Sequence, residues 1–150
     1  MSESILSTLR EEHRRAKSLM EQIESCKDVV KKKELYLQLK EELIPHMEGE
    51  EQTIYAHLME DVHDEEAEEV AQIAESEHQE VKDLLKQLDN MGIENVTWDT
   101  TFKKLKDCVT KHVEEEESAL FAEAKQDFSK EELIEIGDEF AEAKSHITSY

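Results

Sequence analysis

The chain has 150 residues, of which 38% are charged and 5% aromatic, and it contains one proline. This length and composition are typical of a single domain built from long helices. The net charge of −21 disfavours nucleic acid or an anionic membrane as a partner, because phosphate groups are bound by clusters of Lys and Arg.

The sequence also lacks the patterns of an exported or membrane protein. Its N-terminus has no basic stretch followed by an apolar segment, as a signal peptide would. No apolar run approaches the roughly 18 residues that a membrane span requires. Cys26 and Cys108 are too few for a disulfide framework. We therefore expect a cytoplasmic protein.

Apolar residues recur at helical spacing along most of the chain. They form four stripes, over residues 5–23, 35–58, 70–88 and 102–121. Pro45 lies inside the second stripe and predicts a kink there, but the stripe resumes in phase, which favours one continuous helix.

The ends of these helices carry their own signals. Gly92 suits the left-handed position that ends the third helix. Asp99 is a candidate N-cap for the fourth helix, and Ser129 with Glu132 forms a capping box that opens a fifth.

Short connections between long helices predict antiparallel neighbours. We therefore predict an all-α fold, an up-down-up-down four-helix bundle with a short C-terminal fifth helix. One domain is expected over residues 1–150, with the bundle over about 1–127 and the last helix over about 130–147.

Four of the seven histidines belong to a pattern that occurs twice. Each copy begins with Glu-His and ends, one predicted hairpin later, with His-x-x-x-Glu. The residues are Glu12, His13, His46 and Glu50 in the first copy and Glu77, His78, His112 and Glu116 in the second.

His and Glu four positions apart lie nearly one above the other on a helix, about 6 Å apart along its axis. Both can reach a shared point in the bundle core. Buried without a metal, Glu50 and Glu116 would be costly charges, and a pair of cations would remove that cost. Mixed nitrogen and oxygen ligands suit iron or manganese, and zinc could compete during expression. The alternative is that the histidines are incidental core residues.

The neighbours of these residues are assigned other roles. Glu51 and Glu117 point about 100° away from the shared glutamates and are expected to be solvated. Glu12 and Glu77 either orient neighbouring groups or form exposed salt bridges.

Further residues stay outside the predicted ligand set. Tyr55 and Phe121 follow the shared glutamates by five positions and are expected to pack in the core. His57, His63 and His146 are left open as additional ligands.

Three motifs resemble the hemerythrin-like, or HHE cation-binding, domain family: Leu-x-x-Glu-His at residues 9–13, the run 46–51 and the run 112–121. The resemblance spans about residues 1–125 and implies a four-helix bundle with a non-haem di-iron centre. It implies two iron ions, oxo- or hydroxo-bridged, with zinc or manganese as mis-loaded metals. By position, the implied ligands are His13, His46, His78 and His112, with Glu50 and Glu116 bridging the irons.

The sequence departs from the oxygen-carrying hemerythrins, which have a fifth histidine in a His-x-x-x-His pair on the third helix. Ala74 and Lys82 stand four positions before and after His78. Each iron would then keep open positions. This suits redox chemistry with peroxide or nitric oxide, or labile iron, better than reversible oxygen carriage.

The expected partner is therefore a small molecule: oxygen, peroxide or nitric oxide. An iron or oxygen sensor and an iron donor are the alternatives to a reactive centre. The sequence leaves open whether the chain is an enzyme, and it leaves the oligomeric state open.

Overall fold

The computed structural model describes residues 3–147, and these form helices and no strand. The elements in chain order are α1 (Ile5–Ser25), α2 (Val29–Gln52), α3 (Ile54–Glu60), α4 (Glu65–Asp89), α5 (Val96–Glu115), the π-helical turn η1 (Glu116–Leu120), α6 (Phe121–Asp127) and α7 (Lys130–Ser145).

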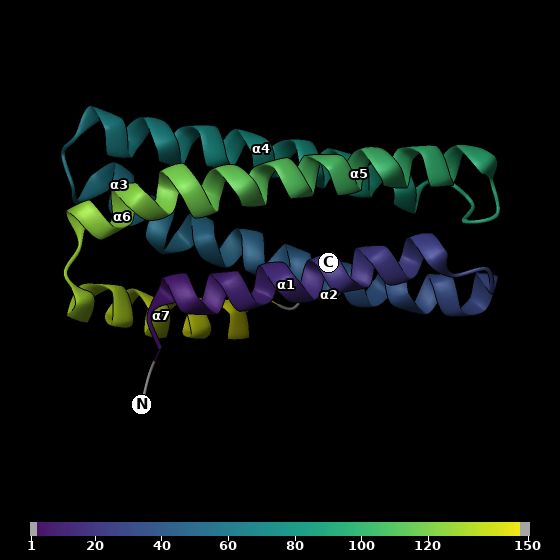
Figure 1. Ribbon diagram of the computed structural model, residues 1–150, viewed down its shortest axis with the longest axis horizontal. Coiled ribbons are helices and arrows are strands. Elements are labelled where there is room, and N and C mark those ends of the chain that lie inside the picture. The colour runs from purple at the N-terminus through teal and green to yellow at the C-terminus, as the bar shows by residue number, and fades with distance from the viewer. Residues whose placement is uncertain (1–2, 148–150) are drawn as a thin grey trace.

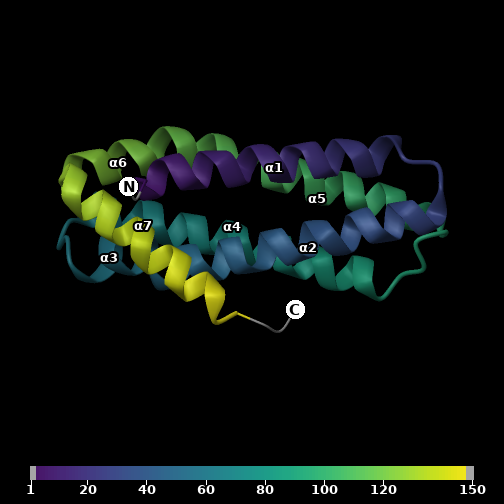
Figure 2. The ribbon, with the colours of Figure 1, turned by 90° about the horizontal axis from the view of Figure 1, so that it is seen from below.

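These elements form the predicted all-α four-helix bundle (Figure 1). The first helix is α1, the second is α2 with α3, the third is α4, and the fourth is α5 with η1 and α6. The fifth helix, α7, packs across α1 and α2 (Figure 2). None of the helices in residues 3–147 is both long and apolar enough to cross a membrane.

Two of the predicted helix ends are wrong. The fourth helix begins at Val96 because Asn95 caps it, its side chain accepting a hydrogen bond from the Thr97 N–H at 2.9 Å; Asp99 lies inside the first turn. No glycine in residues 3–147 has a positive φ, so Gly92 is not left-handed. The capping box of Ser129 and Glu132 is confirmed.

The second helix continues through Pro45, as predicted, but it is interrupted at Thr53, three residues after Glu50. The fourth helix is interrupted in the matching place, where the π-helical turn η1 begins at Glu116. In a regular helix, a residue five positions after a glutamate points about 140° away from it. A π turn, with its i→i+5 bonding, returns that residue to the same face.

Apolar side chains form two separate clusters along the bundle. One cluster joins the start of α1 to α3, the start of α4, α6 and α7. The other joins the end of α1 to α2, the end of α4 and α5. The repeated His and Glu residues lie between these clusters on every helix of the bundle.

Two glycines let α7 approach the bundle closely. A methyl group at Gly137 would lie 2.7 Å from the Glu3 carbonyl oxygen, and one at Gly49 would lie 2.8 Å from Cε1 of Phe140. The Phe140 ring in turn packs against His46, with ring centroids 6.1 Å apart. Close packing of α7 therefore covers one side of the polar layer.

Candidate metal centre

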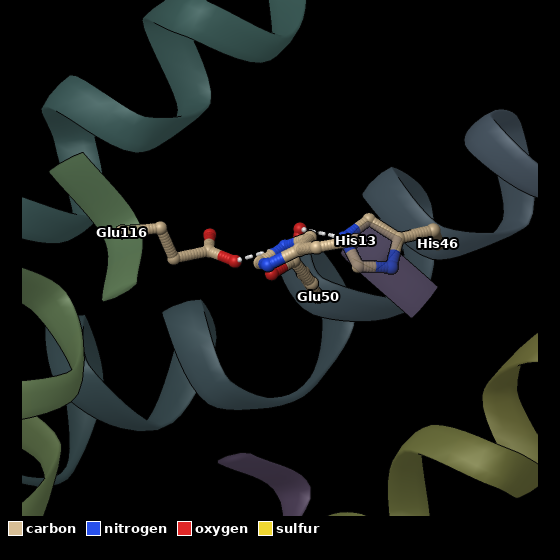
Figure 3. A group of neighbouring side chains, drawn as sticks. All are labelled: His13, His46, Glu50 and Glu116. Carbon is tan, nitrogen blue, oxygen red and sulfur yellow. Dashed lines mark ion pairs between the residues drawn. The ribbon is translucent and has the colours of Figure 1, made fainter. Parts of the chain in front are cut away.

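The six predicted ligands converge in the polar layer, and all six are buried. They form two groups, in each of which the possible ligand atoms lie within 4.8 Å of one another. Half-site 1 contains His13 and His46 (Figure 3), and half-site 2 contains His78 and His112. Both half-sites share Glu50 and Glu116.

All four imidazoles direct Nε2 toward the shared carboxylates. In half-site 1, Nε2 of His13 lies 3.0 Å from Glu116 Oε1, and Nε2 of His46 lies 3.1 Å from Glu50 Oε1. In half-site 2, Nε2 of His78 lies 3.1 Å from Glu50 Oε1, and Nε2 of His112 lies 3.3 Å from Glu116 Oε2. The His-x-x-x-Glu spacing thus brings each pair to one point.

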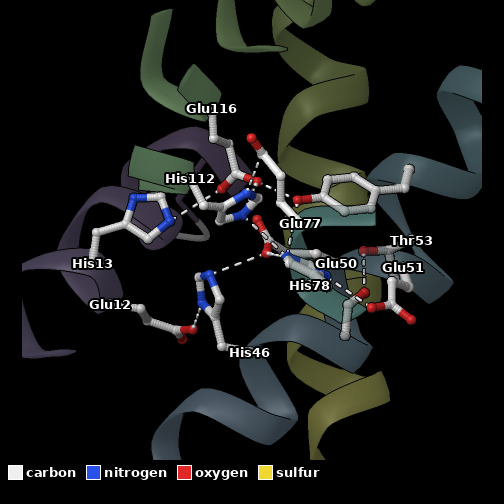
Figure 4. Close-up of polar contacts among 12 residues, drawn as sticks. Glu12, His13, His46, Glu50, Glu51, Thr53, Glu77, His78, His112 and Glu116 are labelled. Carbon is white, nitrogen blue, oxygen red and sulfur yellow. Dashed lines mark hydrogen bonds and ion pairs between the residues drawn. The ribbon is translucent and has the colours of Figure 1, made fainter. Parts of the chain in front are cut away.

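Each imidazole also donates from Nδ1 to an outer carboxylate on a neighbouring helix, and Figure 4 shows these contacts for His46, His78 and His112. These contacts close a ring around the bundle, from α1 through α2, α4 and α5 with η1 back to α1. The pairs are Glu12 with His46 at 2.7 Å, Glu51 with His78 at 2.8 Å, Glu77 with His112 at 2.8 Å and Glu117 with His13 at 2.7 Å. A carboxylate on Nδ1 fixes the tautomer that presents an Nε2 lone pair to the centre.

This ring corrects the expectation for two of the four outer glutamates. Glu51 and Glu117 are half-buried and hydrogen-bonded rather than solvated, because the histidine of the adjacent helix reaches them. For Glu12 and Glu77, the orienting role is the alternative that the structure supports.

Tyr55 was expected only to pack in the core, but it also takes part in the polar layer. Tyr55 is fully buried and donates its hydroxyl hydrogen to Glu116 Oε2. The hydroxyl oxygen of Tyr55 lies 3.2 Å from His78 Nε2. The interruption at Thr53 directs it there. The equivalent residue, Phe121, stacks beside His13 with ring centroids 6.5 Å apart and has no hydroxyl.

Several polar atoms of the centre are buried without a hydrogen-bond partner in residues 3–147. They are Nε2 of His13 and His46, both carboxylate oxygens of Glu50 and Oε1 of Glu116. Nε2 of His13 faces Glu116 Oε1 at 3.0 Å, and Nε2 of His46 faces Glu50 Oε1 at 3.1 Å. A cation satisfies such a donor set, and no side chain of the described residues does so.

The electrostatics of the centre also favour a cation. Burial and the charge of Glu116 raise the pKa of Glu50 to about 8. Burial opposes the charge of His112, but contacts with Glu116 and Glu77 outweigh it and raise the pKa of His112 to about 10. The raised pKa values show that the centre favours added positive charge, which a metal ion would supply.

The three remaining candidate histidines lie outside the centre. His57 contacts Asp61 and, at 2.7 Å, Glu139 of α7. His63 is exposed in the loop before α4, with a positive φ of 56°, and His146 is exposed at the end of α7.

Two cavities reach the centre from different sides. One, of about 190 Å³, is lined by His13, His46 and His112 and bordered by Lys144 of α7. The other, of about 330 Å³, lies between α4 and α5 and reaches His112, Glu116 and Ala74.

A helical bundle with a buried cluster of four histidines and two shared glutamates is typical of a cation-binding protein. Residues 4–124 match the family model of the hemerythrin HHE cation binding domain. The chain belongs to this family, and metal-cation binding follows from that membership.

The chain is also similar to two individual proteins. A DNA nickase from Nostoc sp. (strain PCC 7120) is 28% identical over 144 residues, which cover 96% of this chain and 40% of that protein. A hemerythrin HHE cation binding domain-containing protein from Mycobacterium kansasii has a crystal structure that matches with a TM-score of 0.81. It is 22% identical, and the match covers 95% of this chain and 85% of that one, which supports the fold.

Proposed function

We propose that this chain is a non-haem di-iron protein that binds or reacts with a small oxidant: oxygen, hydrogen peroxide or nitric oxide. One observation carries the proposal: two buried groups of nitrogen and oxygen donors share a pair of carboxylates. Such donors suit iron. In this proposal the terminal ligands are His13, His46, His78 and His112, and the bridging ligands are Glu50 and Glu116.

The residues of this chain would prepare the centre rather than carry the redox step. The outer carboxylates hold each imidazole with its proton on Nδ1 and its Nε2 lone pair inward. The apolar clusters on both sides keep bulk water away from the shared glutamates. Bound iron would supply the electrons for reduction of a small oxidant.

The cavity beside Ala74 supports open coordination positions. It is lined by Ala74, His112 and Glu116, so space remains beside one of the two positions, Ala74 and Lys82, at which a His-x-x-x-His pair would place a fifth histidine. A diatomic molecule or peroxide fits such a space. We also propose that residues 1–150 form one domain, because α7 packs on α1 and α2.

Metal quantification with optical spectroscopy tests the proposal. Ferrous loading without oxygen should give two irons per chain, one for each half-site, and the spectrum should change on adding oxygen, peroxide or nitric oxide. His112→Ala should lower the iron content and abolish the near-ultraviolet band of a bridged iron pair, whereas His57→Ala should preserve both. A chain that takes up no iron, or loaded protein that none of the three molecules affects, would contradict the proposal.

Ala74→His tests the open position directly. The new imidazole should fill the cavity and occupy a coordination position, so azide should bind the iron-loaded variant at least about tenfold more weakly. Gln72→His, at an exposed position of α4 that does not line the cavity, is the matched control. Equal azide affinity in wild type and Ala74→His would argue against an open position there.

The similarity to a DNA nickase does not lead us to propose nicking. The match covers 40% of that protein, and the charge of −21 opposes binding to a polyanion. We infer that the matched part of the nickase is an HHE domain like this one. Incubation of the iron-loaded chain with supercoiled plasmid should leave the plasmid intact, and metal-dependent nicks lost in His112→Ala would overturn this inference.

A further inference from the structure

Three carboxylates gather at the end of the bundle where α4 begins and α6 ends. Glu123 and Asp127 lie one turn apart on α6, and Asp64 is the N-cap of α4. An oxygen of each lies within 4.8 Å of the other two. Glu123 follows Glu116 by seven residues, about 10 Å along a helix, and the cluster shares no residue with the His/Glu centre.

The cluster is more than an exposed acidic surface. Glu123 is only 7% exposed, and its Oε2 is buried without a hydrogen-bond partner in the described part of the chain. Asp127 Oδ2 is likewise buried and unpartnered. Within residues 3–147, neither residue forms an ion pair with Lys, Arg or His. Asp64 uses one oxygen, Oδ1, to accept from the Glu66 N–H at 3.2 Å.

We propose that Asp64, Glu123 and Asp127 form a second cation site, which takes a divalent cation of the calcium or magnesium type. All three donors are carboxylate oxygens, the ligands that such hard cations prefer over nitrogen and sulfur. Water would complete the coordination. A bound cation would tie the start of α4 to the end of α6, next to the connection that leads into α7.

A shared proton is the competing account of the same geometry. The contact with Asp127, together with burial, raises the pKa of Glu123 to about 7. A proton between the two carboxylates would therefore relieve their repulsion near neutral pH. A cation and a proton differ in a measurable way, because only the cation site saturates with added metal.

Calorimetric titration of the full chain with CaCl₂ and with MgCl₂, at a pH of about 8 where the proton is largely lost, tests the proposal. One cation should bind per chain and raise the melting temperature, and the better of the two salts identifies the preferred ion. Glu123→Gln keeps the shape of the side chain and should weaken binding at least about tenfold, because affinity depends on ligand charge. Glu131→Gln, on an exposed residue of α7, makes the same charge change and should have no effect.

Asp127→Asn is the second variant, and it decides the matter if circular dichroism shows that Glu123→Gln does not fold. The proposal is overturned if neither salt binds, or if binding is unchanged in the variant that folds. It is also overturned if Glu123 titrates near neutral pH while calcium and magnesium leave the melting temperature unchanged, since the pair then holds a proton only.

Discussion

The two half-sites share Glu50 and Glu116 but differ in what their histidines contact. In half-site 1, Nε2 of His13 and of His46 has no hydrogen-bond partner among residues 3–147. In half-site 2, Nε2 of His78 lies 3.1 Å from Nε2 of His112 and 3.2 Å from the Tyr55 hydroxyl. The polar atoms of half-site 2 thus partly satisfy one another, whereas the two Nε2 atoms of half-site 1 are not satisfied by any described residue.

This difference has a simple origin in the repeated sequence. The position five residues after the shared glutamate is Tyr55 in one copy and Phe121 in the other. The Tyr55 hydroxyl is therefore one of two differences between the half-sites, the other being the contact between the Nε2 atoms of His78 and His112. Half-site 1 should accept a metal ion readily, whereas half-site 2 must first give up hydrogen bonds and a proton.

The largest expected effect comes from removing one half-site at a time. The double variant His78→Ala/His112→Ala keeps half-site 1 and should hold one iron. The double variant His13→Ala/His46→Ala keeps half-site 2 and should hold its iron more weakly. Iron per chain after dialysis measures both, with His57→Ala as the control. Stronger iron retention by the variant that keeps half-site 2 would contradict the proposed difference between the half-sites.

A smaller effect is expected from the outer carboxylates. Glu12→Gln should weaken iron binding by about 10–100-fold, because the amide no longer fixes the His46 tautomer. Glu12 also pairs with Lys144 of α7, so its loss should disturb half-site 1 more than Glu77→Gln disturbs half-site 2. Competition with a chelator measures the affinities. Glu11→Gln is the exposed control, and an equal effect in that variant would exclude an orienting role.

Tyr55→Phe should reduce the asymmetry between the half-sites, because it leaves the contact between His78 and His112 in place. Without a metal, the variant should lose about 1–3 kcal/mol of stability, since Glu116 loses a buried donor. The loss should be smaller in iron-loaded protein, where the metal satisfies the same oxygen. Urea unfolding of both forms tests this. Tyr36→Phe removes a hydroxyl that contacts Asp89 and the Leu85 carbonyl, and its cost should be equal in both forms. A metal-independent cost for Tyr55→Phe would contradict the account.

The smallest expected effect concerns α7, which covers half-site 1. Burial lowers the pKa of His57, but its contacts with Glu139 and Asp61 outweigh burial and raise that pKa above 6.5. The pairing of α3 with α7 is therefore fully present below pH 6.5 and lost as the pH rises through the raised value. For such an exposed pair the contribution is about 0.2–1 kcal/mol.

Hydrogen exchange of α7 measures this pH dependence. Exchange should quicken as the pH rises above 6.5 in the wild type, after correction for the intrinsic rate, and Glu139→Gln should flatten the change. If the intrinsic exchange rate accounts for the entire pH dependence of the wild type, His57 does not hold α7.

The sequence pattern was sufficient for the architecture and for the convergence of six residues. Apolar stripes with 3.6-residue spacing predicted the bundle, and the repeated His-x-x-x-Glu pairs required only regular helices to reach one point. Their assignment as metal ligands stays a prediction. The fifth helix was predicted because the capping box of Ser129 and Glu132 is a local signal.

The surroundings of the centre depended on features that are not local. Tyr55 reaches the centre because the helix is interrupted at Thr53, and regular helical geometry would have pointed it away. Glu51 and Glu117 depend on the position of a histidine on the next helix. That position depends on how neighbouring helices align along their axes. The apolar periodicity of a single helix carries no information about this alignment.

The central claim is that two metal ions lie between four histidines and share Glu50 and Glu116. Anomalous diffraction at the iron edge from crystals of iron-loaded protein tests it most directly. The account predicts two peaks, one beside the Nε2 atoms of His13 and His46 and one beside those of His78 and His112. A single peak, or iron bound away from both shared glutamates, would contradict it.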